Sequence, residues 1–310
     1  MDIINGTRAE ATEGMERIKI FLTGGKGQVG FELARHFNLI GDVYAPTRAE
    51  LDLSDLTAVQ AYLDEVQPSL VLNAAAYTAV DRAETDQTVC WQLNVKLPEL
   101  LATYCRNTDS AFIHFSSDYV YSGAGEHFRH EHESTQPINF YGRSKLAGDQ
   151  AVAKASRDNM WYILRTSWVY SARGNNFMKT MLRLGASKHE LNVVNDQIGA
   201  PTPARLLALS ALLLTENMAD SGVYHVAPRG ETSWQGFAQE IFRQALAAGV
   251  PLAITPDNVF GIASEDYPTP AQRPLNSRLD VSALESAVMI DMPSWQSELA
   301  LTLAEYLDKQ

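Results

Sequence analysis

Cysteine is scarce in this chain of 310 residues, which contains only Cys90 and Cys105. Two cysteines cannot form a framework of several disulfide bridges, and their separation does not match the spacing of ligands in a zinc site. Such sparse use of cysteine is typical of a protein that works in a reducing compartment. We therefore expect a cytoplasmic protein.

Excess basic charge and long apolar runs are also missing. The chain has 25 lysine and arginine residues against 37 aspartate and glutamate residues, which gives a formal net charge of -12. This balance argues against a nucleic-acid-binding protein, because phosphate backbones require a basic field. A nucleotide remains an allowed ligand, since a few local donors can hold a pyrophosphate. No apolar run approaches the roughly 20 residues needed to span a bilayer, so we expect no membrane segment.

Strand-like and helix-like segments alternate along the first half of the chain. β-rich runs occur at RIKIFLTGG, DVYAPTR, SLVLNAAA, SAFIHFSS and MWYILRTSWVY, and segments with helical spacing lie between them. This alternation indicates βαβ units and a mostly parallel sheet. Because the strands are apolar without strict alternation, we expect helices on both faces of the sheet. The sequence thus predicts the α/β class, with a doubly wound parallel sheet of the Rossmann type.

We expect three parts along the chain. Residues 1–16 are polar and acidic without the apolar core of a signal peptide, and are interpreted as a leader or a cloning remnant. Residues 17–168 are expected to form the dinucleotide-binding domain. After Trp168, short strands, turns and proline-rich stretches predict a smaller mixed α/β lobe, mainly for substrate binding, over residues 169–310. Segments near residues 203–227 are expected to return to the first domain.

A glycine-rich loop follows the first strand. Gly24, Gly27 and Gly30 recur at three-residue spacing, directly before a segment with helical periodicity. Such glycines allow a tight turn, a close approach of the backbone to a pyrophosphate, and close packing of helix on strand. The free N–H groups and the dipole at the helix N-terminus also favour phosphate. The position predicts a dinucleotide site, and the alternative is a turn that serves packing alone.

The end of the second strand bears on the choice of cofactor. An acidic residue there normally holds the ribose hydroxyls of NAD, whereas a basic residue accommodates the 2′-phosphate of NADP. Thr47 and Arg48 occupy this place, which favours NADPH, with NADH as a second candidate. Asp52 follows and either faces the adenine or caps the next helix. Ala74–Ala76 end the third strand and either let a flat cofactor lie against the backbone or serve helix–sheet packing.

A serine, a tyrosine and a lysine indicate the chemistry. Ser117 and Asp118 end the fourth strand, where ligands of open α/β sheets bind. Tyr141 and Lys145 lie one helical turn apart on the following helix. Hydride transfer to a ketone requires a proton at the developing alkoxide, and a lysine ammonium can lower the phenol pKa from its usual value of about 10. We predict Tyr141 as the acid, Lys145 as its tuner and ribose ligand, and Ser117 as a donor to the carbonyl. Each feature alone also fits a solvated helix face or an ordinary strand end.

With these motifs the chain resembles the extended short-chain dehydrogenase/reductases, and more narrowly the dTDP-4-dehydrorhamnose reductase family. The narrower likeness rests on RTSWVYSARGNNF, NDQIGAPT and RPLNSRLD, and the whole resemblance covers most of the chain. It implies NADPH-dependent reduction of the C4 ketone of a dTDP-linked deoxysugar. The resemblance implies cofactor contacts at Gly27, Gln28, Val29, Asp52, Leu53, Ala75, Ala76, Tyr77 and Thr78, and substrate contacts at Ser117, Asp118, Trp168, Asn175, Asn176, Arg273 and Arg278.

The chain departs from the family at one point. Some members dimerise around a magnesium ion held by glutamates, but the corresponding places here hold Arg205 and Gln296. A cation does not ligate a cation, so we expect no metal, and a monomer or weak homodimer. Two rivals stay open: a related nucleotide-sugar 4-ketoreductase with the same triad, and a non-catalytic regulatory subunit that binds NADP and a partner enzyme.

Overall fold

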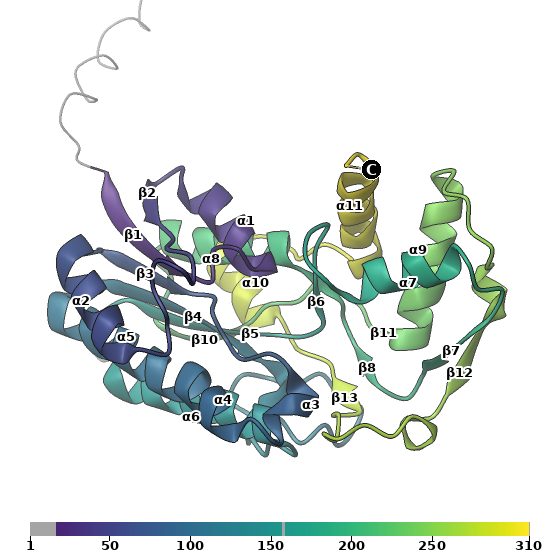
Figure 1. Ribbon diagram of the computed structural model, residues 1–310, viewed down its shortest axis with the longest axis horizontal. Helices are drawn as coiled ribbons and strands as arrows, with labels where there is room; N and C mark the ends of the chain where they lie inside the picture. Colours follow the sequence, from purple (N-terminus) through teal and green to yellow (C-terminus); the bar gives the residue numbers. More distant parts are fainter. Residues whose placement is uncertain (1–16, 157–158, 310) are drawn as a thin grey trace, which may run out of the picture.

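A six-stranded, wholly parallel sheet forms the larger part of the protein, as the computed structural model in Figure 1 shows. The structure describes residues 17–156 and 159–309, so the interpretation of residues 1–16 lies outside the described residues. The strand order is β10-β5-β4-β3-β1-β2. The strands of this sheet are β1 (Ile18–Thr23), β2 (Gly41–Tyr44), β3 (Leu70–Asn73), β4 (Ala111–Ser117), β5 (Trp161–Thr166) and β10 (Gly222–His225).

Helices cover both faces of this sheet, because its strands bury side chains on either side (Figure 1). Residues such as Phe21 and Val71 pack against one helical layer, and their neighbours Leu22 and Leu72 pack against the other. The first layer consists of α2 (Leu56–Val66), α5 (Leu97–Thr108) and α6 (Phe140–Ala155), and the second of α1 (Gln28–Phe37), α8 (Ala204–Glu216) and α10 (Ser282–Val288). The predicted doubly wound parallel sheet is confirmed.

The segments around residues 203–227 lie against the large sheet. α8 packs on α1, and β10 pairs in parallel with β5. Four short helical elements lie in the connections that follow β3 and β4. They are α3 (Val80–Ala83), α4 (Gln87–Trp91), the π-helix η1 (Gln92–Lys96) and the 3-10 helix η2 (Asp118–Val120).

A second, smaller lobe has its own apolar core, which includes Phe237, Phe242 and Trp295. Its helices lie to the right in Figure 1, beside paired short strands. The helices of this lobe are α7 (Phe177–Gly185), α9 (Trp234–Ala247) and α11 (Trp295–Leu307), with 3-10 turns η3 (Pro256–Asn258) and η4 (Ser264–Asp266). Its short strands are β6 (Val169–Tyr170), β7 (Leu191–Val194), β8 (Ile198–Gly199), β9 (Thr202–Pro203), β11 (Thr232–Ser233), β12 (Val259–Ile262) and β13 (Asn276–Ser277).

The helices of the described residues are too short or too polar to cross a bilayer. The longest of them, α6, bears Tyr141, Lys145 and Asp149 on its buried side. Its first turn is fixed by Asn139, whose side chain accepts a hydrogen bond from the Gly142 N–H at 2.7 Å. This cap sets where the helix begins and therefore where its buried polar side chains point.

Candidate active site

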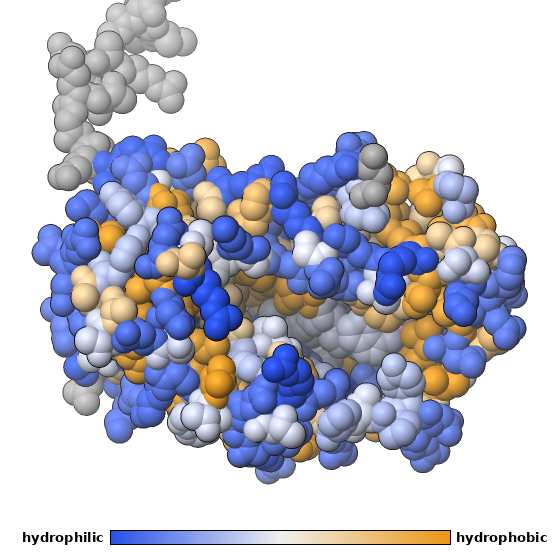
Figure 2. All heavy atoms as spheres, in the orientation of Figure 1, coloured by the Kyte–Doolittle hydropathy of each residue, from blue (hydrophilic) through white to orange (hydrophobic). Residues whose placement is uncertain are grey.

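A cavity of about 1250 Å³ opens at the carboxyl ends of the sheet strands, between the sheet and the smaller lobe. The molecular surface is hollowed near its middle in Figure 2. The predicted residues that line it are Gly24, Gly27, Gln28, Val29, Thr47, Arg48, Asp52, Leu53, Ala75, Ala76, Tyr77, Thr78, Ser117, Asp118, Tyr141, Lys145 and Trp168. The predicted residues Gly30, Asn175, Asn176, Arg273 and Arg278 are not part of this lining.

The glycine loop forms a tight turn between β1 and α1. The Gly27 N–H donates to the Gly24 carbonyl at 2.8 Å, and Gly24 has a φ of +70°. A Cβ at Gly30 would lie 2.1 Å from the Gly24 carbonyl oxygen, so only glycine allows this approach of helix to strand. Gly27 provides no capping side chain for α1. The first N–H groups of the helix are thus available to an anion, as a pyrophosphate site requires.

The residues after β2 border the same cavity. Arg48 is exposed there, and no acidic side chain takes its place at the end of this strand. Asp52 does not cap α2, because the cap is Asp55, which accepts from the N–H groups of Thr57 and Ala58. The Asp52 carboxylate instead accepts from the Ser54 N–H and hydroxyl, which lowers its pKa. Of the two alternatives for Asp52, the structure favours the one that faces the cavity.

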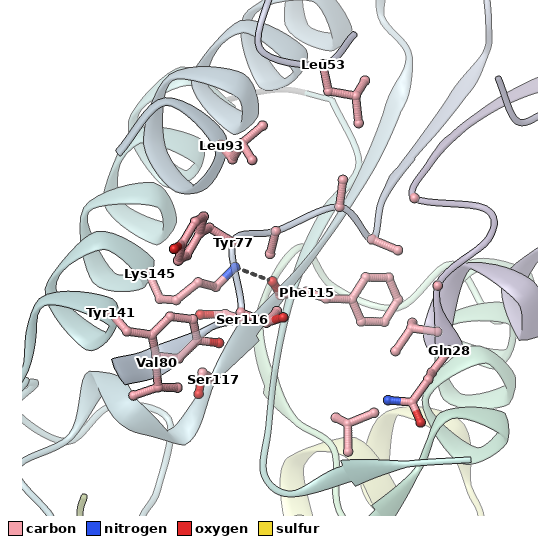
Figure 3. A pocket seen from close by; sticks show the side chains of 18 of the residues that line it. Gln28, Leu53, Tyr77, Val80, Leu93, Phe115, Ser116, Ser117, Tyr141 and Lys145 are labelled. Atoms are coloured by element: carbon pink, nitrogen blue, oxygen red, sulfur yellow. Dashed lines mark hydrogen bonds between the residues drawn. The ribbon is translucent and has the colours of Figure 1, made fainter. Parts of the chain in front are cut away.

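Ser117, Tyr141 and Lys145 lie together on the cavity wall (Figure 3). Ser117 ends β4, and the other two come from α6. The Lys145 ammonium donates to the Phe115 carbonyl at 2.7 Å. The Tyr141 ring packs edge-on against Tyr119, with ring centroids 5.4 Å apart. Strand and helix thus bring a phenol, a hydroxyl and an ammonium to one edge of the sheet.

Burial determines the protonation of this group. Burial lowers the pKa of Lys145 to about 8, and the charge of Asp149 opposes that fall. Burial raises the pKa of the Tyr141 phenol above its usual value, and the Ser117 hydroxyl only partly offsets the rise. Desolvation therefore outweighs any lowering of this pKa by Lys145, and the role of Lys145 as tuner of the phenol stays a prediction. A phenol that stays protonated at neutral pH is a suitable proton donor.

Asp118 joins the two lobes beneath this group. Its carboxyl accepts hydrogen bonds from Ser117 at 3.0 Å and from Ser277 of β13 at 2.5 Å. The side chain is only 3% exposed, and burial raises its pKa to about 6. A carboxyl group that is half protonated near pH 6 and borders a cavity is well placed to contact a polar ligand.

Trp168 stacks on an aromatic side chain that the sequence analysis missed. Its indole lies 3.8 Å, centroid to centroid, from that of Trp234, with an interplanar angle of 16°. Both rings line the cavity, and Trp168 has a φ of +50°. The Trp234 indole N–H donates to Gln197 at 3.1 Å. Trp234 opens an amphipathic helix, so the sequence offered no signal that set it apart from a core residue.

Three of the four remaining predicted substrate residues have partners within the protein. The Asn176 amide donates to Gln28 of the glycine loop at 2.8 Å, and Asn175 is exposed. Arg273 pairs with Asp81 at 2.6 and 2.8 Å. A separate residue, Arg278, pairs with Glu231 at 2.5 Å. The structure therefore gives Asn176, Arg273 and Arg278 roles in holding loops together, and the contact of all four residues with a substrate stays a prediction.

Arg205 forms an ion pair with Glu298 of α11, at an N–O distance of 2.9 Å. Among the described residues, no group of three or more histidine, cysteine or acidic side chains is arranged to hold a metal ion. The Arg205 guanidinium thus pairs with the buried carboxylate of Glu298.

Comparisons with known proteins agree on one family. Residues 18–308 match the family model described as the RmlD substrate binding domain. The dTDP-4-dehydrorhamnose reductase of Burkholderia thailandensis is 39% identical over 302 residues, which cover 94% of this chain and all of the relative. The reductase of the same name from Escherichia coli K12 is 39% identical, with 90% of this chain and 95% of the relative covered.

Solved structures give the same result. The dTDP-4-dehydrorhamnose reductase of Bacillus anthracis in complex with NADP superposes with a TM-score of 0.86 and 32% identity, covering 93% of this chain and 99% of that chain. A UDP-glucose 4-epimerase of Thermus thermophilus complexed with NAD, at 18% identity and a TM-score of 0.78, shares the fold.

Proposed function

The chain belongs to the RmlD substrate binding family, and on that premise we propose that it is an NADPH-dependent reductase of dTDP-4-dehydro-L-rhamnose. Its product would be dTDP-L-rhamnose, formed in the last step of the synthesis of that nucleotide sugar. The observation that carries the proposal is the meeting of Tyr141, Ser117 and Lys145 on the wall of a cavity that also contains the glycine loop.

The cavity residues fit a dinucleotide. The open helix N-terminus at Gly27 offers N–H groups to the pyrophosphate, and Arg48 offers a cation to a 2′-phosphate. Ala75 and Ala76 leave room along the end of β3 for the remainder of the cofactor. When bound, NADPH supplies the hydride that reduces the ketone at C4.

The side chains of the protein manage the proton and the orientation of the sugar. We assign Tyr141 as the acid, because its buried phenol is protonated at neutral pH and can pass that proton to O4. Ser117 would hold the carbonyl oxygen by a hydrogen bond. Lys145 keeps a positive charge beside the group, which stabilises the phenolate left after proton transfer. Asp118 and Trp168 border the place that the deoxysugar would occupy.

The direct test follows NADPH absorbance with enzymatically prepared dTDP-4-dehydro-L-rhamnose. Wild-type protein should oxidise NADPH rapidly, and Tyr141→Phe should reduce kcat by roughly 10²- to 10⁴-fold, because the variant lacks the acidic proton. Tyr62→Phe is a matched control, since the Tyr62 ring packs on Phe21 outside the cavity lining. If wild-type protein binds NADPH but leaves this substrate unreduced, other 4-keto nucleotide sugars become the next candidates and then a partner enzyme.

We also propose that the enzyme acts in the cytoplasm as a monomer or weak homodimer without a bridging metal. The ion pair of Arg205 with Glu298 supports the absence of a bridging metal, because the arginine already provides a cation beside that carboxylate. Sedimentation velocity with and without a chelator tests the oligomeric state and its dependence on a metal. A dimer that dissociates only when the chelator is added would contradict this proposal.

A further inference from the structure

A buried polar cluster of His114, Asp149 and Arg165 lies next to Lys145 and outside the cavity lining. The Lys145 ammonium is 3.5 Å from Nε2 of His114, and that nitrogen is 3.9 Å from Oδ1 of Asp149. Asp149 lies one helical turn after Lys145 on α6, and both side chains are at most 3% exposed. Its other oxygen accepts from Nε of Arg165 at 3.0 Å. The carboxylate is therefore fixed in place and faces the lysine across an imidazole ring.

The hydrogen-bond network determines which nitrogen of His114 has the proton. The Thr23 hydroxyl donates to Oδ1 of Asn73 at 2.7 Å, so the Asn73 nitrogen faces Nδ1 of His114 at 3.0 Å as the donor. A neutral ring then has its hydrogen on Nε2, the atom nearest Asp149. Within the described part of the chain, Oδ1 of Asp149 has no hydrogen-bond partner, because Nε2 of His114 at 3.9 Å is beyond hydrogen-bond distance. Polar groups this deeply buried are normally paired, so the geometry points to an electrostatic role for this oxygen.

Asp149 is the anion of this cluster. The titratable groups that face Lys145 are Tyr141 and Asp149 from α6, Cys90 from α4 and His114 from β4. Burial raises the pKa of the Tyr141 phenol and of the Cys90 thiol, so both are neutral at pH 7. Burial lowers the pKa of His114 well below its usual value, so the imidazole is neutral too. Of these groups, Asp149 alone has a negative charge with which to balance the buried ammonium.

We propose that Asp149 is the countercharge that keeps the buried Lys145 side chain as an ammonium at the cofactor site. Asp149 is thus a positioning residue that acts through Lys145, and Arg165 is its anchor. An isolated ammonium in a buried site is costly, and a nearby anion offsets that cost. The inference rests on the proposed function, because an ammonium at this place matters only for a ligand in the cavity.

The variants Asp149→Asn and Arg165→Gln separate this role from plain structural damage. Each breaks the same buried ion pair and should lower the melting temperature by a similar amount. Only Asp149→Asn removes the negative charge, so its basic limb in the pH profile of kcat/KM should move to lower pH by about one unit or more. Arg165→Gln leaves the carboxylate free to act on Lys145, so its limb should stay or move to higher pH. Asp149→Glu should restore the wild-type limb.

A second readout makes the test independent of turnover. The Kd of NADPH, measured by quenching of tryptophan fluorescence from pH 6 to about 9.5, should rise at a lower pH in Asp149→Asn than in wild-type protein. Glu298→Gln is a further control, because it breaks a partly buried arginine–carboxylate pair elsewhere in the protein and should leave both profiles unchanged. Equal shifts in Asp149→Asn and Arg165→Gln, or none in Asp149→Asn, would overturn the inference. If wild-type protein does not reduce the sugar nucleotide, the proposed function fails. The pH dependence of the Kd of NADPH still decides whether Asp149 is the countercharge of Lys145.

Discussion

Asp118 is an acid whose environment opposes its charge. Burial raises its pKa to about 6 from an ordinary value of 3.8, although Ser117 and Ser277 both donate to it. The folded protein therefore binds a proton here that the unfolded chain releases between about pH 4 and pH 6. Stability from this group is present below about pH 4 and is lost as the pH rises to about 6. The difference corresponds to about 3 kcal/mol, since each pKa unit is worth about 1.4 kcal/mol.

Asp118→Asn should remove this dependence. An amide of the same shape keeps an acceptor for one serine and has no charge to desolvate, so the variant should melt at a higher temperature than wild-type protein at pH 7. At pH 4 the two proteins should melt at similar temperatures. Thermal denaturation of both proteins at half-unit steps between pH 4 and 7 measures this. A difference in melting temperature that stays the same at every pH would contradict the prediction. Activity should fall, because Asp118 borders the proposed sugar site.

At the residue scale the sequence was informative where chemistry follows a local spacing. Tyr141 and Lys145 share a helix, and Ser117 ends a strand, so secondary structure alone brings them to one edge. The side chains that surround them depend on long-range packing. Trp234 reaches the cavity from a helix 66 positions after Trp168, and no local pattern predicts that meeting.

At the scale of elements, close packing holds α6 in place. A Cβ at Gly148 would lie 2.1 Å from the Asn94 carbonyl oxygen of η1, and one at Gly142 would lie 2.2 Å from the Tyr119 carbonyl oxygen. Both contacts are to backbone atoms, which cannot swing aside. The two glycines therefore allow α6 to approach the π-helix η1 and the 3-10 helix η2, and this approach sets the depth of Lys145.

Gly148→Ala should force α6 away from η1. Overpacking of this kind typically costs about 1 to 3 kcal/mol, and the displaced helix should also reduce kcat. Differential scanning calorimetry and the NADPH assay measure the two effects. Gly222→Ala is the matched control, because a Cβ there meets nothing within 4 Å and Gly222 has no positive φ. A Gly148→Ala protein as stable and active as Gly222→Ala would show that the helix can shift freely.

Element boundaries explain where the sequence-based predictions differ from the structure. The run MWYILRTSWVY predicts one strand, yet β5 ends at Thr166 and β6 begins at Val169. The break lies at Trp168, whose left-handed backbone an indole rarely adopts. Strands of two residues such as β8 and β13 have no periodicity to detect, because their pairing comes from tertiary contacts.

At the scale of the whole molecule, three contacts join the lobes around the cavity in addition to the bond of Asp118 with Ser277. Trp168 stacks on Trp234, and Gln28 of the glycine loop accepts from Asn176. A third contact, the ion pair of Asp81 with Arg273, ties α3 to the segment before β13. Because the glycine loop belongs to the sheet and Trp234 to the smaller lobe, and both line the cavity, we expect the smaller lobe to hold the sugar nucleotide while the sheet holds the cofactor.

Trp234→Leu should weaken the sugar site alone. Loss of an aromatic stack worth about 0.5 to 1.5 kcal/mol should raise the KM for the sugar nucleotide roughly 2- to 10-fold. Trp234→Phe should keep most of the affinity, and the Kd of NADPH should not change in either variant. Trp161→Leu at the other end of β5 is the control, because Trp161 packs in the core outside the cavity lining. A weaker NADPH complex in Trp234→Leu would place this stack in the cofactor site instead.

The strand order of the large sheet also matters while the chain is being synthesised. Five of the six strands are complete by Thr166, but α8, β10 and α10, which cover one face and one edge, come after Pro203. At about 5 to 20 residues per second, the ribosome needs several seconds to make the missing cover. Throughout that delay α1 is the one helix of that layer already made, so part of the apolar face of the sheet remains open to water and to other nascent chains. The newborn protein is therefore at its most aggregation-prone in mid-synthesis, and chaperones that bind exposed apolar chain would protect it most at that stage.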